Sequence, residues 1–299
     1  MTRASTGAAV TSWLRRASIA AIALGLLAAA FIGGHSAWLA HQSLHPARGP
    51  APTDVPGESV TFRGANGVSL AGSWLPSRNG AALVLAHGLG ADRRQLLAEA
   101  SLLADRGYGV LLFDERDHGS SGGTISTWGD LEQADVGQAV NLVVSRPGVD
   151  PTRIGALGFS IGGAAVALTA ATDSRIRAVA IEATFASLED DYRYTFGRYG
   201  ALSALPALWT LRLEGVDVAA VRPVDALCAI SPRPLLLVYG THDPGEPPTL
   251  GDRMRAAACG PASLVMIDTH RHGDYATDAP AQYEPALTRF FDTALARGG

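Results

Sequence analysis

The sequence predicts an α/β fold, a mostly parallel sheet flanked by helices, with a transmembrane helix at the N-terminus. Short apolar segments of strand length alternate with segments of helical periodicity, which is typical of a parallel sheet covered on both faces. The 299 residues are 47% hydrophobic, enough for one large domain with a full core and a terminal appendage. Strands are expected at 60–63, 69–75, 82–86, 110–113, 154–157, 178–181, 235–239 and 263–267, and helices at 95–106, 131–145, 161–171 and 285–295.

The N-terminal segment contains an apolar run over 17–34. As a helix this run is about 27 Å long, close to the thickness of a bilayer core. Arg15 and Arg16 precede the run, and no acidic residue occurs before Asp54. This charge distribution favours a cytoplasmic N-terminus and an extracytoplasmic domain.

Two interpretations of the N-terminal segment remain open. A cleaved signal peptide needs a small-x-small cleavage site, and 35–41 has no clear one, whereas Trp38 suits a membrane interface. We therefore expect a single-pass signal-anchor over 1–45, with secretion after cleavage as the alternative. The proline-rich segment 46–56 reads as a linker, and 57–299 as the globular domain.

The segment Gly158-Phe159-Ser160-Ile161-Gly162 carries the strongest chemical signal. It follows a predicted strand and opens a predicted helix, so Ser160 would lie at the apex of a sharp strand-to-helix turn. The flanking glycines suit so tight a turn, because a side chain there would collide with neighbouring backbone. This arrangement exposes a nucleophilic serine.

Candidate partners for Ser160 follow it in the order Asp243, then His272, each directly after a predicted strand. His272 is expected to act as the general base and Asp243 to orient it. His270 is a rival base, while Asp217 and Asp225 precede their strand and are weaker candidates for the acid.

The oxyanion formed on attack needs two preorganised donors. The backbone N–H groups of Ile161, which follows the nucleophile, and Leu89, in the loop after 82–86, form the expected pair. His87 is expected to hold that loop in place rather than to take part in catalysis.

Four segments resemble the α/β-hydrolase superfamily, and the resemblance covers 57–295. They are His87-Gly88-Leu89-Gly90, the D-x-R-G-H-G-x-S-x-G-like segment 113–122, Gly240-Thr241-His242-Asp243 and His272-Gly273-Asp274-Tyr275. Asp117 and Arg271 stand where the family usually has glycine. The subgroup is similar to bacterial serine hydrolases with a short cap, grouped under the name serine aminopeptidase S33. The resemblance implies hydrolysis through a serine triad.

The segment 185–222 interrupts the alternation of strands and helices and is rich in aromatic residues. We expect it to form a helical cap over the strand ends. An ordinary long crossover connection is the alternative.

Composition excludes several functions. The net charge of −4 gives no sign of a nucleic-acid surface. All 24 basic residues are arginine, so no lysine is present for a Schiff base or a Ser-Lys dyad. Cys228 and Cys259 are expected to be two partly buried thiols, with a single bridge as the alternative outside the cytoplasm.

The predicted function is a serine hydrolase that cleaves a carboxylic ester or related acyl compound. Its partners are a small-molecule acyl substrate and the membrane. The pattern His270-x-His272-x-Asp274 allows a metal, but no suitable partner cluster accompanies it, so neither metal nor cofactor is expected. The alternatives are a catalytically silent, membrane-tethered binding module, and an acyltransferase or peptidase with the same triad.

Overall fold

The described residues fold around one eight-stranded sheet with the order β1-β2-β4-β3-β5-β6-β7-β8. The computed structural model describes residues 4–297, with side-chain exposure from residue 13 onward. β2 pairs antiparallel with β1 and β4, and all pairs from β4 to β8 are parallel. The mostly parallel α/β prediction is confirmed.

The strands are β1 (Glu58–Arg63), β2 (Ser69–Leu75), β3 (Ala82–Ala86), β4 (Gly109–Phe113), β5 (Ile154–Phe159), β6 (Ile176–Glu182), β7 (Leu235–Gly240) and β8 (Ala262–Ile267). The helices are α1 (Ala4–Leu44), α2 (Leu97–Asp105), α3 (Glu132–Val144), α4 (Ile161–Thr172), α5 (Leu188–Phe196), α6 (Ala201–Leu213), α7 (Pro223–Ile230), α8 (Leu250–Ala257), α9 (Tyr275–Asp278) and α10 (Pro280–Ala294). Single 3-10 turns occur at Ala65–Gly67, Arg93–Leu96 and Gly197–Tyr199.

Two hydrophobic cores cover the two faces of the sheet. α3, α4, α7 and α8 pack on one face. α2, α9 and α10 pack on the other. The central strands β3, β4, β5 and β7 are buried along their whole length, which explains their continuous apolar sequences.

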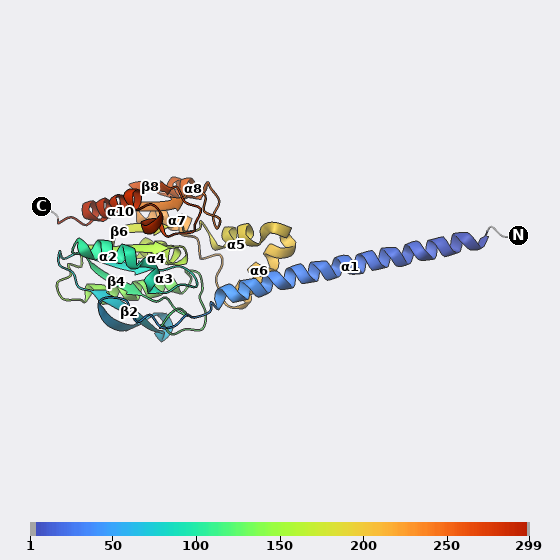
Figure 1. Cartoon of the computed structure of the whole chain (residues 1–299), viewed down its shortest axis with the longest axis horizontal. Helices are drawn as coiled ribbons and strands as arrows, with labels where there is room; N and C mark the ends of the chain where they lie inside the picture. The colour runs from blue at the N-terminus through green and yellow to red at the C-terminus, as the bar shows by residue number, and fades with distance from the viewer. Residues whose placement is uncertain (1–3, 298–299) are drawn as a thin grey trace.

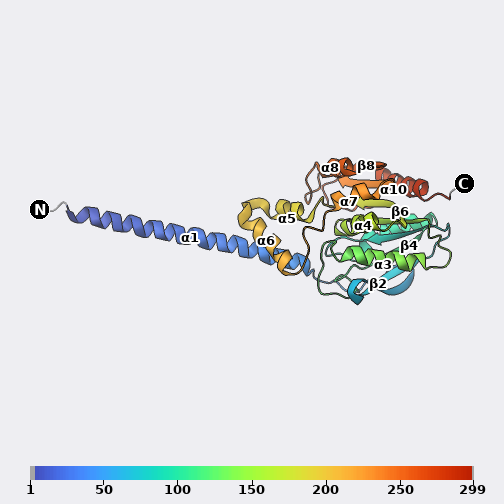
Figure 2. The ribbon, with the colours of Figure 1, turned by 180° about the vertical axis from the view of Figure 1, so that it is seen from behind.

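α1 is a single helix of 41 residues that projects far beyond the domain (Figures 1 and 2). At 1.5 Å per residue it is about 60 Å long, twice the thickness of a bilayer core. Its segment Trp13–Leu44 is long and apolar enough to cross a membrane. The helix extends ten residues beyond the apolar run 17–34, and these last turns reach the domain.

The end of α1 is built into the fold. Ala40 and Leu44 are fully buried, and Ser43 Oγ lies 2.6 Å from the Tyr192 hydroxyl of α5. The Leu44 carbonyl accepts a hydrogen bond from the Ser126 N–H at 2.8 Å. The polypeptide just before the proline-rich segment is therefore fixed to the domain.

The proline-rich segment also contacts the domain. The Arg48 guanidinium donates to Asp117 Oδ1 and to the carbonyl oxygens of Ser121 and Gly123. Asp117 has a φ of 61°, a left-handed conformation that aspartate tolerates better than most residues. This conformation explains how aspartate can replace the glycine that the family usually has at this position. The carboxylate of Asp117 binds the Arg48 guanidinium.

Between β6 and α7 the chain leaves the sheet as a helical hairpin, α5 and α6 joined by the turn Gly197–Tyr199. We call residues Leu188–Leu213 the cap hairpin. α6 lies alongside the second half of α1 (Figures 1 and 2). The interruption expected at 185–222 is therefore helical, and it contacts the N-terminal helix.

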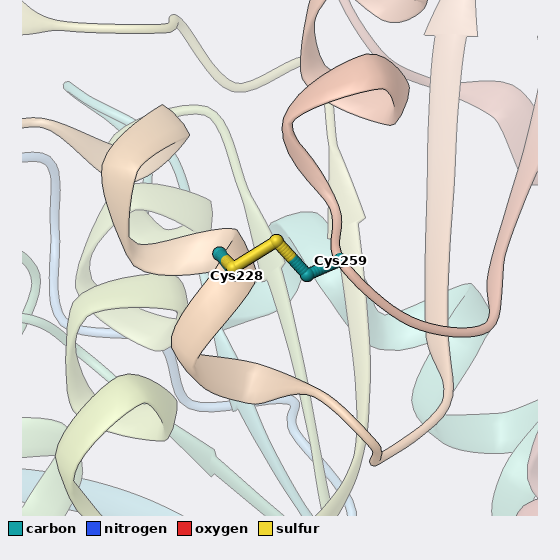
Figure 3. The surroundings of a disulfide bond; sticks show 2 residues. All are labelled: Cys228 and Cys259. Carbon is teal, nitrogen blue, oxygen red and sulfur yellow. A yellow bond between two sulfur atoms is a disulfide. The ribbon is translucent and has the colours of Figure 1, made fainter.

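Cys228 of α7 and Cys259, in the turn before β8, form a disulfide (Figure 3). The expectation of two separate thiols is wrong, and the single bridge left open as the alternative is what the structure contains. The two residues are 31 positions apart, and only the packing of α7 beside the α8–β8 turn brings them together.

We predict that replacing both cysteines, Cys228→Ala with Cys259→Ala, lowers the free energy of unfolding by about 3–4 kcal/mol, the loop-closure value for this separation. Urea unfolding of the full chain in detergent measures the change. Reduction of the wild type should produce the same loss and leave the double variant unaffected. An unchanged free energy of unfolding of the wild-type protein after reduction of the disulfide would contradict the prediction.

Candidate active site

Ser160 occupies a strained turn between β5 and α4. Its φ of 53° and ψ of −118° are rare for a residue with a side chain, and strain of this kind concentrates at functional sites. A methyl group at Gly158 would overlap the carbonyl of Gly162, and one at Gly162 would overlap the carbonyl oxygens of Ala86 and His87. Glycine at these positions lets the turn pass this close to β3.

The structure brings Ser160, His272 and Asp243 together. His272 Nε2 lies 3.1 Å from Ser160 Oγ, and His272 Nδ1 lies 2.8 Å from Asp243 Oδ2. The Asp243 side chain is buried, whereas His272 is one-third exposed. Asp243 Oδ1 accepts the Gly245 N–H at 2.8 Å, which fixes the carboxylate toward the imidazole. The Ser160 hydroxyl does not cap α4 by a side-chain hydrogen bond, so it is available for the contact with His272 Nε2.

The rival residues are occupied elsewhere. The His270 ring stacks on His242 at 4.6 Å between centroids. Asp217 accepts the amides of its own turn, and Asp225 pairs with Arg222. These contacts give each residue a local structural role away from Ser160.

In the loop after β3, hydrogen bonds occupy the N–H groups of Gly88 and Gly90 and leave the Leu89 N–H without an acceptor among the described residues. The Gly88 N–H donates to Gln95 Oε1 at 2.7 Å, and the Gly90 N–H donates to His118 Nε2 at 3.0 Å. Within residues 4–297, neither the Leu89 N–H nor the Ile161 N–H has an acceptor. Both predicted oxyanion donors therefore remain available. No sequence pattern singled out Gln95 or His118 for these roles, although His118 lies inside the family-like segment 113–122.

His87 and Asp114 are structural. His87 is buried with its Nε2 accepting the Glu115 N–H at 3.0 Å, and burial lowers its pKa to about 3, so the ring is neutral. The buried Asp114 carboxylate binds the Arg93 guanidinium at 2.7 Å and the Ser120 N–H at 2.8 Å. Both side chains tie the loops after β3 and β4 together.

Two further carboxyl groups lie close to the His272–Asp243 pair. Asp191 of α5 is partly buried; desolvation raises its pKa to about 7, and nearby His272 opposes the shift. Glu246 is buried, and desolvation together with Asp191 and Asp243 raises its pKa to about 9. Glu246 follows Asp243 by three residues, but nothing in the sequence places the α5 residue Asp191 here.

One group of side chains could hold a metal ion. His41 of α1 and His45, which directly follows the helix, meet Glu214 after α6, and His41 Nδ1 lies 2.8 Å from Glu214 Oε1. The rings of the two histidines lie 4.5 Å apart between centroids. The group joins the N-terminal helix to the cap hairpin and includes none of Ser160, Asp243 and His272.

Comparisons with known proteins agree with this fold. The family described as serine aminopeptidase, S33, matches residues 77–215. The chain belongs to the α/β-hydrolase superfamily, a class of hydrolases. It is 30% identical to the uncharacterised protein YfhR of Escherichia coli O157:H7 over 258 residues, covering 83% of this chain and 84% of that protein.

Two characterised proteins are also similar. The thiohydrolase aneE of Aspergillus aculeatus is 37% identical over 135 residues, 42% of each chain. The structure of the Pyrococcus furiosus esterase Pf2001 superposes with a TM-score of 0.69 at 19% identity, covering 85% of this chain and all of that one. The second similarity supports the fold alone.

We predict that Gly162→Ala destabilises the protein by about 1–3 kcal/mol, because the added methyl overlaps backbone carbonyls that cannot move freely. Gly137→Ala in α3 is the matched control, since its methyl would meet only Thr169 Cγ2 at 4.0 Å. That change should raise stability slightly through helix propensity. Thermal unfolding of both variants in detergent measures the difference; equal melting temperatures would contradict the prediction.

Proposed function

We propose that this protein is a membrane-anchored serine hydrolase that cleaves a carboxylic ester or thioester through an acyl-enzyme. The observation that carries the proposal is the linked chain Ser160–His272–Asp243, with hydrogen-bond distances of 3.1 Å and 2.8 Å. Distances in this range allow proton transfer between the nucleophile and its base. The membership in a hydrolase family supports the same class of reaction.

In this mechanism Ser160 Oγ attacks the acyl carbonyl while His272 Nε2 takes the hydroxyl proton. Asp243 accepts the hydrogen bond from His272 Nδ1–H and stabilises the imidazolium that forms. His272 then gives its proton to the leaving alcohol or thiol. Water, activated by the same imidazole, releases the acid and restores Ser160.

The tetrahedral intermediate carries its negative charge on the former carbonyl oxygen. The N–H groups of Leu89 and Ile161 are the proposed donors, because neither has an acceptor within residues 4–297 and the amides on both sides of Leu89, those of Gly88 and Gly90, are already paired. Loss of one such donor typically costs about 3 kcal/mol in the transition state.

The proposed location is a single-pass anchor with the hydrolase domain outside the cytoplasm. α1 supplies a span of sufficient length and hydropathy, and the arginines before it favour a cytoplasmic N-terminus. The disulfide fits the oxidising compartment that this orientation gives. The burial of Ala40 and Leu44 favours retention of the helix over its removal.

We predict covalent labelling of Ser160 by a fluorophosphonate, mapped by mass spectrometry on the full chain in detergent. Ser160→Ala should abolish the adduct. His272→Ala should lower hydrolysis of a soluble p-nitrophenyl ester by about 10³-fold or more, and Asp243→Asn by about 10⁴-fold.

The control is Asp225→Asn, an exposed aspartate paired only with Arg222, which should keep full activity. Turnover that persists in Ser160→Ala would refute the mechanism. Binding of the ester without labelling or turnover would favour the silent binding module.

A second prediction concerns pH. As pH rises through about 7, Asp191 becomes negatively charged beside the candidate site. Asp191→Asn removes this charge, and because a negative charge holds protons on neighbouring groups, the rise of kcat/KM with pH should move to lower pH.

The neighbouring residue offers a matched control, because Asp190 is engaged by Arg253 at 2.7 Å. Asp190→Asn should leave the pH profile in place. A profile that moves in Asp190→Asn but not in Asp191→Asn would contradict the assignment.

A further inference from the structure

Apolar side chains occur on every side of α6, whose one charged residue is Arg212 near its end, although only one side is covered by protein. Its buried side consists of Ser203, Ala204, Ala207, Leu208 and Leu211. Its exposed side consists of Leu202, Leu205, Trp209 and Leu213, which are 40–80% exposed. The spacing of three, four and four residues makes these side chains one stripe along the helix. A helix that is apolar all round is ordinarily covered all round.

Exposed apolar side chains are concentrated in two neighbouring elements. From residue 13 to 297, every large hydrophobic side chain that is exposed belongs either to α1 or to the cap hairpin. Those of the hairpin are the four of the α6 stripe with Tyr194 and Tyr199. The rest of the domain has the polar surface of a protein in water, so whatever covers α1 also covers this stripe.

The contacts between α1 and α6 determine where the stripe lies relative to the proposed membrane-spanning part of α1. A methyl group at Gly33 would lie 3.3 Å from Pro206 Cγ and 3.5 Å from the Leu202 carbonyl. Gly33 stands at the end of the apolar run 17–34, where a spanning helix leaves the hydrocarbon. At the other end of α6, Glu214 pairs with His41, two turns further toward the domain. Leu202 therefore lies at the membrane boundary, and Leu213 farther from it.

The hairpin tip has the side chains that suit this boundary. Tyr199 is half-exposed, and the Arg198 guanidinium lies 5.7 Å from the centre of its ring. Aromatic side chains and arginines gather where hydrocarbon meets headgroups, because one end of each is apolar and the other is polar.

The buried side of α6, opposite the stripe, is connected to the candidate active site. Ala40 and Leu44 of α1, Leu208 and Leu211 of α6, and Ile161 next to Ser160 belong to one hydrophobic cluster, with Leu89 packed against it. The same apolar core thus extends from the boundary helix to the two proposed oxyanion donors.

We propose that the cap hairpin inserts its α6 stripe into the surface of the phospholipid bilayer, so that the active site takes an acyl lipid directly from the membrane. This proposal rests on the proposed anchoring by α1 and names the substrate class of the proposed hydrolase. The bilayer is the occupant because α6 lies beside α1, which is long and apolar enough to span it.

The test uses the full chain in nanodiscs of phosphatidylcholine and phosphatidylglycerol. A nitrobenzoxadiazole label is attached, without reductant, in Leu202→Cys, Leu213→Cys or the control Asp105→Cys, at the exposed end of α2. Lipids that carry a nitroxide near the headgroup quench only labels in contact with lipid. We expect about a two-fold or greater loss of emission at position 202, a smaller loss at 213 and none at 105.

Equal emission at positions 202 and 105, with the chain in the disc, would overturn the proposal. So would a label at 202 that is shielded from water yet insensitive to the nitroxide, because a second protein copy would then cover the stripe. A chain that does not enter the disc overturns the anchoring as well. Fluorophosphonate labelling of Ser160 in the same discs reports separately whether the proposed chemistry holds.

A second variant tests the substrate class. Changing the stripe with Leu202→Gln, Trp209→Gln and Leu213→Gln leaves the buried side of α6 intact. We expect hydrolysis of a monoacylglycerol in the disc to fall by about three-fold or more, with hydrolysis of a water-soluble butyryl ester unchanged. An equal loss on both substrates, or no loss on the lipid, would contradict lipid uptake through the hairpin.

Discussion

The close passage of the β5–α4 turn beneath the end of β3 is the constraint on which the candidate site depends. Gly158 and Gly162 allow backbone to approach backbone without side chains, and Ser160 is held at a φ of 53° as a result. The same approach sets the Ile161 amide beside the loop that carries Leu89. A larger residue at either glycine would move the nucleophile and its proposed donors together.

Around this turn, each working group is positioned by a neighbour that does no chemistry. Gln95 and His118 use the amides that flank Leu89, and Gly245 fixes the carboxylate of Asp243. The neutral, buried His87 joins the loops after β3 and β4. Preorganisation of this kind holds hydrogen-bond donors in place before negative charge develops on the substrate. Most of the rate acceleration of such sites comes from this electrostatic preorganisation.

The end of the N-terminal helix is part of the packing of the domain. Its last turns are buried against the cap hairpin, and Ser43 meets Tyr192 of α5. These contacts join α1 to the cap hairpin. Because of these contacts, the proposed active site, the proposed membrane-facing surface and the apolar stripe of α6 belong to one packed unit.

The sequence by itself determined the sheet, the strand-end placement of Ser160, Asp243 and His272, and the presence of a long apolar helix. Alternating apolar segments and glycine-flanked turns are local patterns, so they can be read without coordinates. Pairing of Cys228 with Cys259, the position of Asp191 beside His272, and the packing of α6 along α1 were decided only by tertiary structure. Each joins residues far apart in the chain, and no local periodicity encodes which distant side chains share a contact.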